Sequence, residues 1–431
     1  MAHDTPETFK DLMIYEVFAR AYSKDEGKRF VAIKEDLPRI KSMGINVLWL
    51  MPIHPTGEKD RKGTLGSPYA IKDYYSIDPS IGNEEDFKDL VKMAHEMKIK
   101  VIMDMVLNHC ATDSPLVRKH PEWFIRDENG KPSRKVDDWS DVYDFDYSNP
   151  EVMEYMLEMM KYWVKEFDID GFRCDVAGLV PLVFWLRSRR ELSELKPNII
   201  WISETHDAHM YEAFDITYDY DGYYKFKDLL LGKGTLREYL QFIEFQDRLY
   251  PSNYIKMRFL ENHDQERIAK LVEDEALLRN LVVWLFTLKG VPLVYNGQEY
   301  GLKEKPDIFN TCIISWSEGK KEIFDFYMKV AHFRSSSYVV RHGNFKLLVN
   351  DCPNHVISYC TFIDRRFILF VLNLSGGEKE VCVNLSEFTQ NAWFHAYNLL
   401  SEETVRLRID ENGKARVALS REPLIASGYL R

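Results

Sequence analysis

Several charged side chains stand at the ends of short apolar runs in this 431-residue sequence. Arg173 and Asp175 fall in GFRCDVA, Glu204 follows NIIWIS, and Asp264 closes FLENHD. Two carboxylates can divide acid–base and nucleophilic work when their surroundings push their pKa values apart. An arginine two residues before Asp175 lies on the same face of a strand and can hold that carboxylate ionised and oriented. These residue types therefore predict carboxylate-based acid–base and nucleophilic chemistry.

Polar side chains also end other apolar runs of the sequence. A lone Asp at a strand end is more often a helix cap than a catalyst, and a lone His there is often structural. The joint pattern differs, because carboxylates buried together cost stability unless Arg or His side chains partner them. Stability alone gives no reason to gather such groups, so the set indicates a functional site. Its further members are Asp104, Asn108, His109, Thr205, His206, Glu261, Asn262, His263, Asn296, Gln298 and Glu299.

The elements that must position these groups are apolar runs that alternate with amphipathic stretches. We expect helices over 32–43, 86–97 and 150–167. This alternation predicts parallel strands with right-handed crossovers, and eight units predict an α/β fold, the (β/α)8 TIM barrel. The functional site of such a barrel lies at the carboxyl ends of its strands. The predicted strands lie in LMIYEVF, INVLWLMPI, KVIMDMVLNH, DIDGFRCDVA, NIIWISETH, EAFDITYDY, KMRFLENHDQ and VPLVYNGQE.

Two segments interrupt this alternation. Residues 110–147, between the third strand and its helix, are rich in charge, proline and aromatic residues, and an insertion this long is usually functional. From residue 341 onward, strand patterns alternate with turn signals such as Asn412-Gly413, which predicts an antiparallel β-sandwich domain. We therefore expect a barrel over 1–109 and 148–340, a short inserted domain over 110–147 and a C-terminal β domain over 341–431.

Composition limits the classes of binding partner and the cellular compartment that we expect. The net charge is −11, and an acidic chain repels phosphate backbones, so we expect no nucleic-acid partner. No apolar run is long enough to span a bilayer, and the first residues lack a secretory signal pattern, so we expect no membrane association. The six cysteines form no close CxxC pair, which favours reduced thiols and a cytoplasmic protein. The oligomeric state stays open.

Four motifs, taken in order, resemble those of the α-amylase family, glycoside hydrolase family 13. They are DMVLNH, GFRCDVA, the Glu of ISETH, and FLENHD, and GSPYAIKDYYSID and GVPLVYNGQE also resemble family segments. The resemblance covers nearly the whole chain. It implies a glycosidase that cleaves α-1,4-glucosidic bonds in starch-type glucans or maltooligosaccharides. It also implies retention of configuration through a covalent glycosyl-enzyme intermediate, with no organic cofactor.

The same resemblance assigns roles to single residues. Asp175 matches the nucleophile, Glu204 the general acid and base, and Asp264 the third carboxylate, which grips sugar hydroxyls. Arg173 orients Asp175, and Asp104 matches a residue that braces this arginine. The remaining matches contact the sugar and are His109 and His263, which bond its hydroxyls, and Tyr69, which stacks under it.

One departure from the family pattern follows the predicted nucleophile. Many α-amylases carry a Lys-His pair there, whereas this sequence continues with Val176, Ala177, Gly178 and Leu179. Two alternatives for the activity therefore remain. One is an amylase, and the other is a transglycosylase, α-glucosidase or cyclomaltodextrinase on the same scaffold. A non-catalytic carbohydrate-binding relative is disfavoured, because such a protein should have lost one of the three carboxylates.

The resemblance further implies one structural calcium ion that joins the barrel to the inserted domain through oxygen ligands. Asn108 matches one ligand, Asp146 is a candidate for another, and the carbonyl of Leu179 stands in for a family His carbonyl. The alternative is that Asn108 only caps a turn. We expect a second family calcium site to be empty, because the loop AYSKDEGKRF offers only Asp25 and Glu26.

Overall fold

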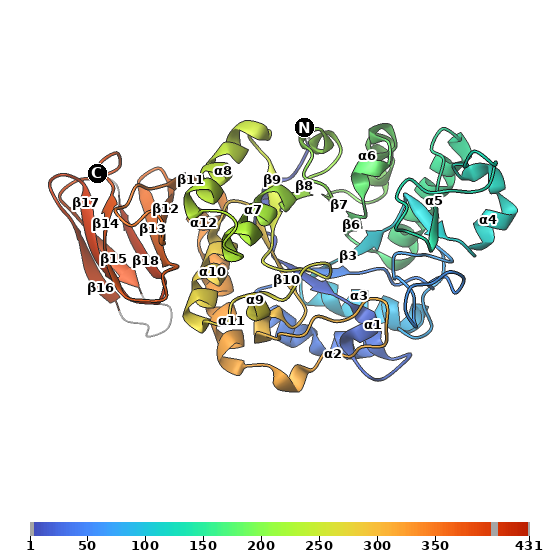
Figure 1. The fold of residues 1–431 in the computed structure, drawn as a ribbon, viewed down its shortest axis with the longest axis horizontal. Helices are drawn as coiled ribbons and strands as arrows, with labels where there is room; N and C mark the ends of the chain where they lie inside the picture. Colours follow the sequence, from blue (N-terminus) through green and yellow to red (C-terminus); the bar gives the residue numbers. More distant parts are fainter. Residues whose placement is uncertain (1–3, 398–403, 430–431) are drawn as a thin grey trace. The chain divides into compact units, whose positions relative to one another are not determined.

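A computed structural model describes residues 4–397 and 404–429 of the chain (Figure 1). Residues 398–403, within the predicted C-terminal domain, and the last two residues lie outside this description. The chain forms two compact units. The first holds Met1–Tyr218 with Lys305–Trp316, and the second holds Asp219–Glu304 with Ser317–Arg431.

Eight parallel strands close into a barrel in the order β1-β10-β9-β8-β7-β6-β3-β2. Seven strands lie within the runs that the sequence singled out, and β9 begins one residue before its run, so the predicted (β/α)8 barrel is confirmed. Every residue of β2, β6 and β7 is buried, as expected for strands that are covered on both faces. The barrel strands are β1 (Ile14–Val17), β2 (Val47–Leu50), β3 (Lys100–Met105), β6 (Gly171–Cys174), β7 (Ile200–Ser203), β8 (Ile216–Tyr218), β9 (Ile255–Arg258) and β10 (Val291–Tyr295).

The strand register of the first unit fixes where its charged residues lie. Asp104 of β3 stands opposite Arg173 of β6, and Arg173 stands opposite Ile202 of β7. Residues two apart on a strand point to the same side. Asp175 and Glu204 each lie two residues beyond this level, directly after β6 and β7. Three neighbouring strands therefore deliver charged side chains to one end of the barrel.

Local sequence signals account for the helix boundaries. Asn83 accepts the N–H of Asp86 at the start of α3, and Asn149 accepts the N–H of Glu151 at the start of α5. The helices predicted over 32–43, 86–97 and 150–167 correspond to α2, α3 and α5. The helices are α1 (Ala19–Tyr22), α2 (Arg29–Ser42), α3 (Glu84–Glu96), α4 (Pro115–Lys119), α5 (Pro150–Phe167), α6 (Leu182–Leu195), α7 (Tyr220–Leu230), α8 (Leu236–Leu249), α9 (Ile268–Leu271), α10 (Glu275–Thr287), α11 (Lys321–Ser336) and α12 (Tyr338–His342).

The insertion between β3 and α5 is built on a short antiparallel pair. Its strands are β4 (His109–Ala111) and β5 (Val142–Asp144), with His109 opposite Asp144. Ala111 and Val142 form a small apolar core with Ala70, and Trp139 packs against it. This core holds the insertion against the segment that contains Tyr69.

The C-terminal strands form one curled antiparallel sheet, drawn from orange to red in Figure 1. A β-bridge between Asn350 and Val383 joins the segment after β11 to β14 at the other end of the sheet. The predicted sandwich is thus a single sheet that encloses its own core, which includes Phe367, Phe394 and Val417. The strands are β11 (Asn344–Leu347), β12 (Val356–Ile363), β13 (Arg366–Asn373), β14 (Lys379–Asn384), β15 (Ala392–Tyr397), β16 (Thr404–Ile409), β17 (Lys414–Leu419) and β18 (Leu424–Tyr429).

Two observations bear on the expectations about compartment. Among the described residues, no helix combines the length and the apolar character needed to cross a membrane. All six cysteines are free thiols.

Cys174, between Arg173 and Asp175, is fully buried, and burial raises the pKa of its thiol. A buried thiol of this kind is a packed core group rather than a nucleophile.

Candidate active site

Arg173 lies at the centre of a group of charged side chains in the first unit. Its side chain is fully buried, and Nη1 donates to Asp104 Oδ1 at 2.9 Å and to Asp175 Oδ1 at 3.0 Å. Nη2 lies 2.7 Å from Glu204 Oε1. One guanidinium group thus holds three carboxylates from the ends of β3, β6 and β7. The planar fork of an arginine suits this task, because its donors point in fixed directions.

Aromatic rings enclose the guanidinium group. The Arg173 Cζ atom lies 5.2 Å from the ring centroid of Trp49, 5.3 Å from that of Tyr218 and 5.7 Å from that of Tyr69. Arg173 Nε also donates to Tyr218 Oη at 3.0 Å. Aromatic faces stabilise a desolvated cation. Tyr218 is not among the residues predicted for the site, although it lies at the carboxyl end of the strand predicted in EAFDITYDY.

Glu204 has a second contact, with the backbone next to the predicted nucleophile. The N–H of Val176 donates to Glu204 Oε2 at 2.7 Å. Val176 has a φ of 36°, in the left-handed region that a β-branched residue rarely adopts, at a cost of about 1–3 kcal/mol. This strained turn aims an amide at Glu204. Val176 therefore positions Glu204 through its backbone.

The Asp175 carboxyl is harder to ionise than an ordinary aspartate. Burial raises its pKa well above the usual range, the nearby Glu204 carboxylate raises the pKa further, and Arg173 opposes both effects. Two interacting carboxyls share their protons, so the pair retains one at a pH where an exposed aspartate is already ionised. A site that holds one proton and one negative charge matches the needs of an acid working beside a nucleophile.

Tyr69 and His109 flank this group of carboxylates. Tyr69 Oη donates to Asp104 Oδ2 at 3.1 Å. His109 is buried, and its ring centroid lies 5.1 Å from that of Trp139. Burial lowers the pKa of His109 to about 4. A neutral imidazole at neutral pH has one donor and one acceptor nitrogen, which suits hydrogen bonds with sugar hydroxyls.

The fourth motif lies in the second unit, after β9. Asn262 Oδ1 accepts the backbone N–H groups of Asp264 at 3.0 Å and Gln265 at 3.1 Å, which fixes the turn. His263 is buried, and its Nε2 lies 3.3 Å from Asp264 Oδ2. The Asp264 side chain is 42% exposed. Asp264 therefore presents a carboxylate to solvent and is held on one side by His263.

Other strand-end polar groups brace their own loops. Glu261 is fully buried and accepts Arg267 Nη1 and the N–H of Ile268, each at 2.6 Å. Gln298 Nε2 donates to Tyr327 Oη at 3.0 Å. These internal contacts give both groups a structural role in the loops after β9 and β10.

The residues expected to bind calcium do not fit that ion. Lys135 Nζ donates to Asn108 Oδ1 at 3.4 Å and to the carbonyl of Leu179 at 3.3 Å. Asp146 Oδ1 accepts the N–H of Ser148 at 2.9 Å, which is a turn contact. Calcium takes about six to eight oxygen ligands, and an ammonium group against two of the three expected ones repels a second cation.

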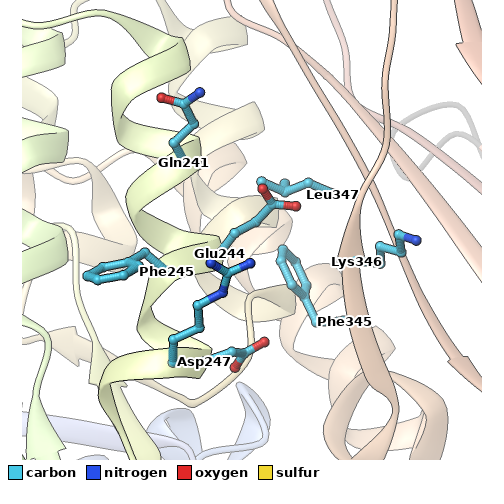
Figure 2. Close-up of a pocket in the computed structure, with 8 residues that line it drawn as sticks. Gln241, Glu244, Phe245, Asp247, Phe345, Lys346 and Leu347 are labelled. Carbon is cyan, nitrogen blue, oxygen red and sulfur yellow. The ribbon is translucent and has the colours of Figure 1, made fainter.

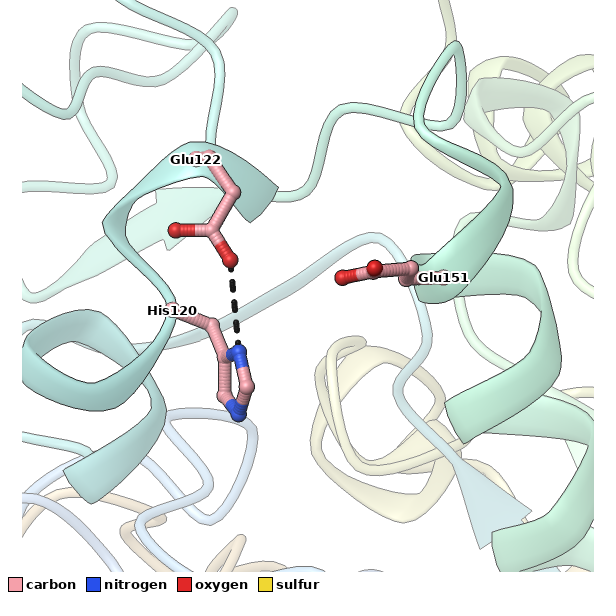
Figure 3. Close-up of side chains that lie close together, drawn as sticks. All are labelled: His120, Glu122 and Glu151. Carbon is pink, nitrogen blue, oxygen red and sulfur yellow. Dashed lines mark hydrogen bonds and ion pairs between the residues drawn. The ribbon is translucent and has the colours of Figure 1, made fainter.

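A different group of metal-type side chains consists of His120, Glu122 and Glu151 (Figure 3). His120 Nδ1 lies 3.3 Å from Glu122 Oε1, and the His120 ring stacks on Trp123 with centroids 4.0 Å apart. Glu151 Oε2 accepts Trp123 Nε1 at 3.0 Å. His120 and Glu151 thus contact Trp123, Glu122 contacts His120, and these contacts account for their proximity without a metal.

Two hollows occur within the second unit. One, of about 540 Å³, lies between α8 and β11 beside Phe245, Glu244 and Lys346 (Figure 2). The other, of about 760 Å³, lies beside Tyr338 and Arg366. None of the predicted site residues lines either hollow.

The comparisons with known proteins cover both parts of the chain. The family model of the α-amylase catalytic domain matches residues 16–141 and 137–337, and that of the α-amylase-like C-terminal domain matches residues 343–431.

Individual relatives agree with the family models. The crystal structure of a noncanonic maltogenic α-amylase, AmyB, from Thermotoga neapolitana is similar at a TM-score of 0.94 and 55% identity, over 98% of this chain and 100% of that chain. An α-amylase structure from Lactobacillus plantarum has a TM-score of 0.89 and 36% identity over the same shares. A cyclomaltodextrinase from Thermoanaerobacter pseudethanolicus is 27% identical over 440 residues, which cover 88% of this chain and 73% of that protein. The chain therefore belongs to the α-amylase family, glycoside hydrolase family 13, and is a glycosidase that acts on α-glucans.

Proposed function

We propose that this glycosidase cleaves α-1,4 bonds of maltooligosaccharides and starch-type glucans with retention of configuration. One observation carries the proposal: a single buried guanidinium, that of Arg173, holds both Asp175 and Glu204. Two carboxyls fixed by the same group keep a constant separation and orientation. That is the requirement of a mechanism in which one attacks the sugar and the other handles the proton.

In the first step Asp175 attacks the anomeric carbon. The glycosidic C–O bond breaks, and its oxygen takes a proton from Glu204 as it leaves with the rest of the glucan. A glycosyl ester of Asp175, with inverted configuration at the anomeric carbon, is the product. Arg173 holds the attacking oxygen in place while charge moves from the carboxylate to the leaving group.

In the second step Glu204 acts as a base. Its carboxylate removes a proton from water, the water oxygen bonds to the anomeric carbon, and the ester bond to Asp175 breaks. The second inversion restores the α configuration, and the site returns to its starting charge. A sugar hydroxyl in place of water would give transglycosylation by the same steps.

The electrostatics of the pair suit this cycle. Burial and the nearby Glu204 carboxylate raise the pKa of Asp175, and Arg173 lowers it. The two carboxyls together are therefore harder to ionise completely than two exposed ones. The cycle needs a proton on Glu204 and a negative charge on Asp175.

We assign the third carboxylate, Asp264, and its neighbour His263 to the sugar hydroxyls. Their place in FLENHD and the family membership of the chain support this assignment. By the family resemblance, Tyr69 is assigned a stacking role under a sugar ring and His109 a hydrogen bond to a sugar hydroxyl. The partly exposed carboxylate of Asp264 suits a group that meets a ligand.

A second candidate substrate is a cyclic glucan. The Lys-His pair that many family members carry after the nucleophile is absent from Val176, Ala177, Gly178 and Leu179, and a relative that is 27% identical to this chain is named a cyclomaltodextrinase. Ring opening and chain cleavage break the same bond. They differ only in the shape of the glucan that the loops admit.

The experiment is incubation with maltoheptaose, β-cyclodextrin, pullulan and sucrose, followed by product analysis and by NMR of the first anomer released. We expect shorter maltooligosaccharides from maltoheptaose, with the α anomer appearing first. Glu204→Gln should abolish turnover but retain oligosaccharide binding, whereas Glu194→Gln, an exposed change on α6, should behave as the wild type. A β anomer as first product would contradict retention, and no product from any substrate would contradict the proposed substrates.

We also propose that the enzyme works in the cytoplasm. Its six free thiols, three of them buried, suit a reducing compartment. Fractionation of the source cells should find the activity with cytosolic markers, and activity released into the medium would contradict this.

A further inference from the structure

The contact between Lys135 and the loop after β6 has no counterpart in the family pattern described above. Lys135 belongs to the insertion, Asn108 follows β3, and Leu179 follows the nucleophile by four residues. The Lys135 ammonium group lies 3.4 Å from Asn108 Oδ1 and 3.3 Å from the Leu179 carbonyl oxygen. A single side chain therefore joins three segments that are separate in the sequence.

A buried carboxylate explains why a cation is needed there. Asp144 is fully buried and stands opposite His109 in the β4–β5 pair. Its Oδ2 accepts the backbone N–H of Lys135 at 3.1 Å, whereas its Oδ1 has no hydrogen-bond partner among the described residues. A buried carboxylate without a nearby positive charge is costly.

We propose that the Lys135 ammonium group is a built-in cation that takes the place of the structural calcium ion between the insertion and the barrel. It supplies positive charge beside Asp144, and it donates to the two neutral oxygens that a calcium ion would ligate. Unlike a bound ion, it is present at every metal concentration. The protein should therefore keep its insertion in place without calcium.

This arrangement also positions catalytic-site residues. Asn108 precedes His109, and its Nδ2 lies 3.2 Å from His109 Nδ1. Leu179 closes the short turn that begins at Val176, whose N–H binds Glu204. Lys135 thus anchors the segment that leads to His109 and the turn that follows Asp175, as a positioning residue that does not itself touch the substrate.

The first test uses the wild-type protein and needs no variant. After dialysis against a chelator, the metal content is measured, and Tm is recorded with chelator and with excess Ca²⁺. We expect no stoichiometric calcium and the same Tm in both conditions. A structural calcium site would bind the folded state alone and would raise Tm by several degrees. Such a rise, or one calcium ion per chain, would overturn the proposal.

The second test asks whether the ammonium group occupies the cation position. Lys135→Ala should lower Tm, and added Ca²⁺ should raise the Tm of this variant while leaving the wild type unchanged. Lys135→Arg should retain most of the wild-type Tm. Lys131→Met, an exposed change in the same insertion, should match the wild type.

Two results of the second test would contradict the proposal: a Tm of Lys135→Ala equal to that of Lys131→Met, or no calcium response in Lys135→Ala. If Lys135→Ala does not fold, Lys135→Arg and the wild-type measurements still decide. The inference does not depend on which glucan is cleaved, because its readouts are metal content and Tm.

Discussion

Arg173 Nη2 and Glu204 Oε1 lie 2.7 Å apart, so the group that holds Asp175, the proposed nucleophile, also holds Glu204, the proposed acid. The same arginine donates to Asp104, which accepts Tyr69 Oη. A substitution at any one of these groups should therefore shift the positions of the others. The site behaves as a unit, and single substitutions should show effects larger than one lost hydrogen bond.

We predict that Arg173→Lys lowers kcat by about 10²-fold, the effect of a small misplacement of reacting groups. A lysine ammonium cannot reach Asp104, Asp175 and Glu204 from one position and loses the donor to Tyr218. Steady-state kinetics on maltoheptaose measure the change. Arg187→Lys, which alters a surface contact with Glu154, is the control. An unchanged kcat in Arg173→Lys would show that the arginine does not position the carboxylates.

We predict that Tyr69→Phe and Tyr69→Ala affect different kinetic parameters. Tyr69→Phe keeps the ring but removes the donor to Asp104, so kcat should fall by at least about tenfold, because one hydrogen bond to a charged group is worth about 1.5–3 kcal/mol, with little change in KM. Tyr69→Ala also removes the surface on which a sugar would stack, so KM should rise. Equal KM values in the two variants would argue against the stacking role.

The buried His54 predicts a loss of stability in mild acid. Its Nδ1 lies 3.0 Å from the carbonyl oxygen of Ser76, and its Nε2 has no hydrogen-bond partner among the described residues. Burial lowers the pKa of His54 to about 4 from the usual 6.5. Between these two pH values the unfolded chain binds a proton at His54 and the folded chain does not. The contribution of His54 to the free energy of unfolding is therefore fully present above pH 6.5 and is lost as the pH falls toward 4.

This contribution amounts to about 3 kcal/mol across that window. Denaturant unfolding at several pH values measures it. His54→Asn keeps a donor for Ser76 but cannot be protonated, so its unfolding free energy should depend less on pH, whereas the exposed change His332→Asn should leave the wild-type slope. A wild-type slope in His54→Asn would assign the acid sensitivity to other groups.

Much of the fold follows from local pattern. The eight apolar runs, the Asn83 and Asn149 caps and the turn residues specify strands and helices without reference to distant contacts, and a closed barrel is the arrangement that buries such runs on both faces. The motifs around Asp175 and Glu204 are short and lie at strand ends. The sequence therefore indicates both the barrel and the end of it that carries the charged groups.

The contacts that the insertion makes could not be predicted from the sequence in the same way. Asp144 and Asp146 are the same residue type, two residues apart, and only the β4–β5 register shows that Asp144 is the one opposite His109. Lys135 reaches Leu179 across 44 residues, and nothing in the charged segment around it marks one lysine as special. Tyr218 was missed for a related reason, because an aromatic residue at a strand end is as common in a core as in a site.

We propose above that Asp175 forms a covalent bond to the sugar. An α-glucosyl fluoride with a ring fluorine that slows breakdown of the ester should trap this intermediate, and peptide mass spectrometry should locate it. We predict one fluorohexosyl adduct on the peptide that contains Asp175, and none in Asp175→Asn. An adduct on another residue, or turnover of the substrate by Asp175→Asn at the wild-type rate, would contradict it.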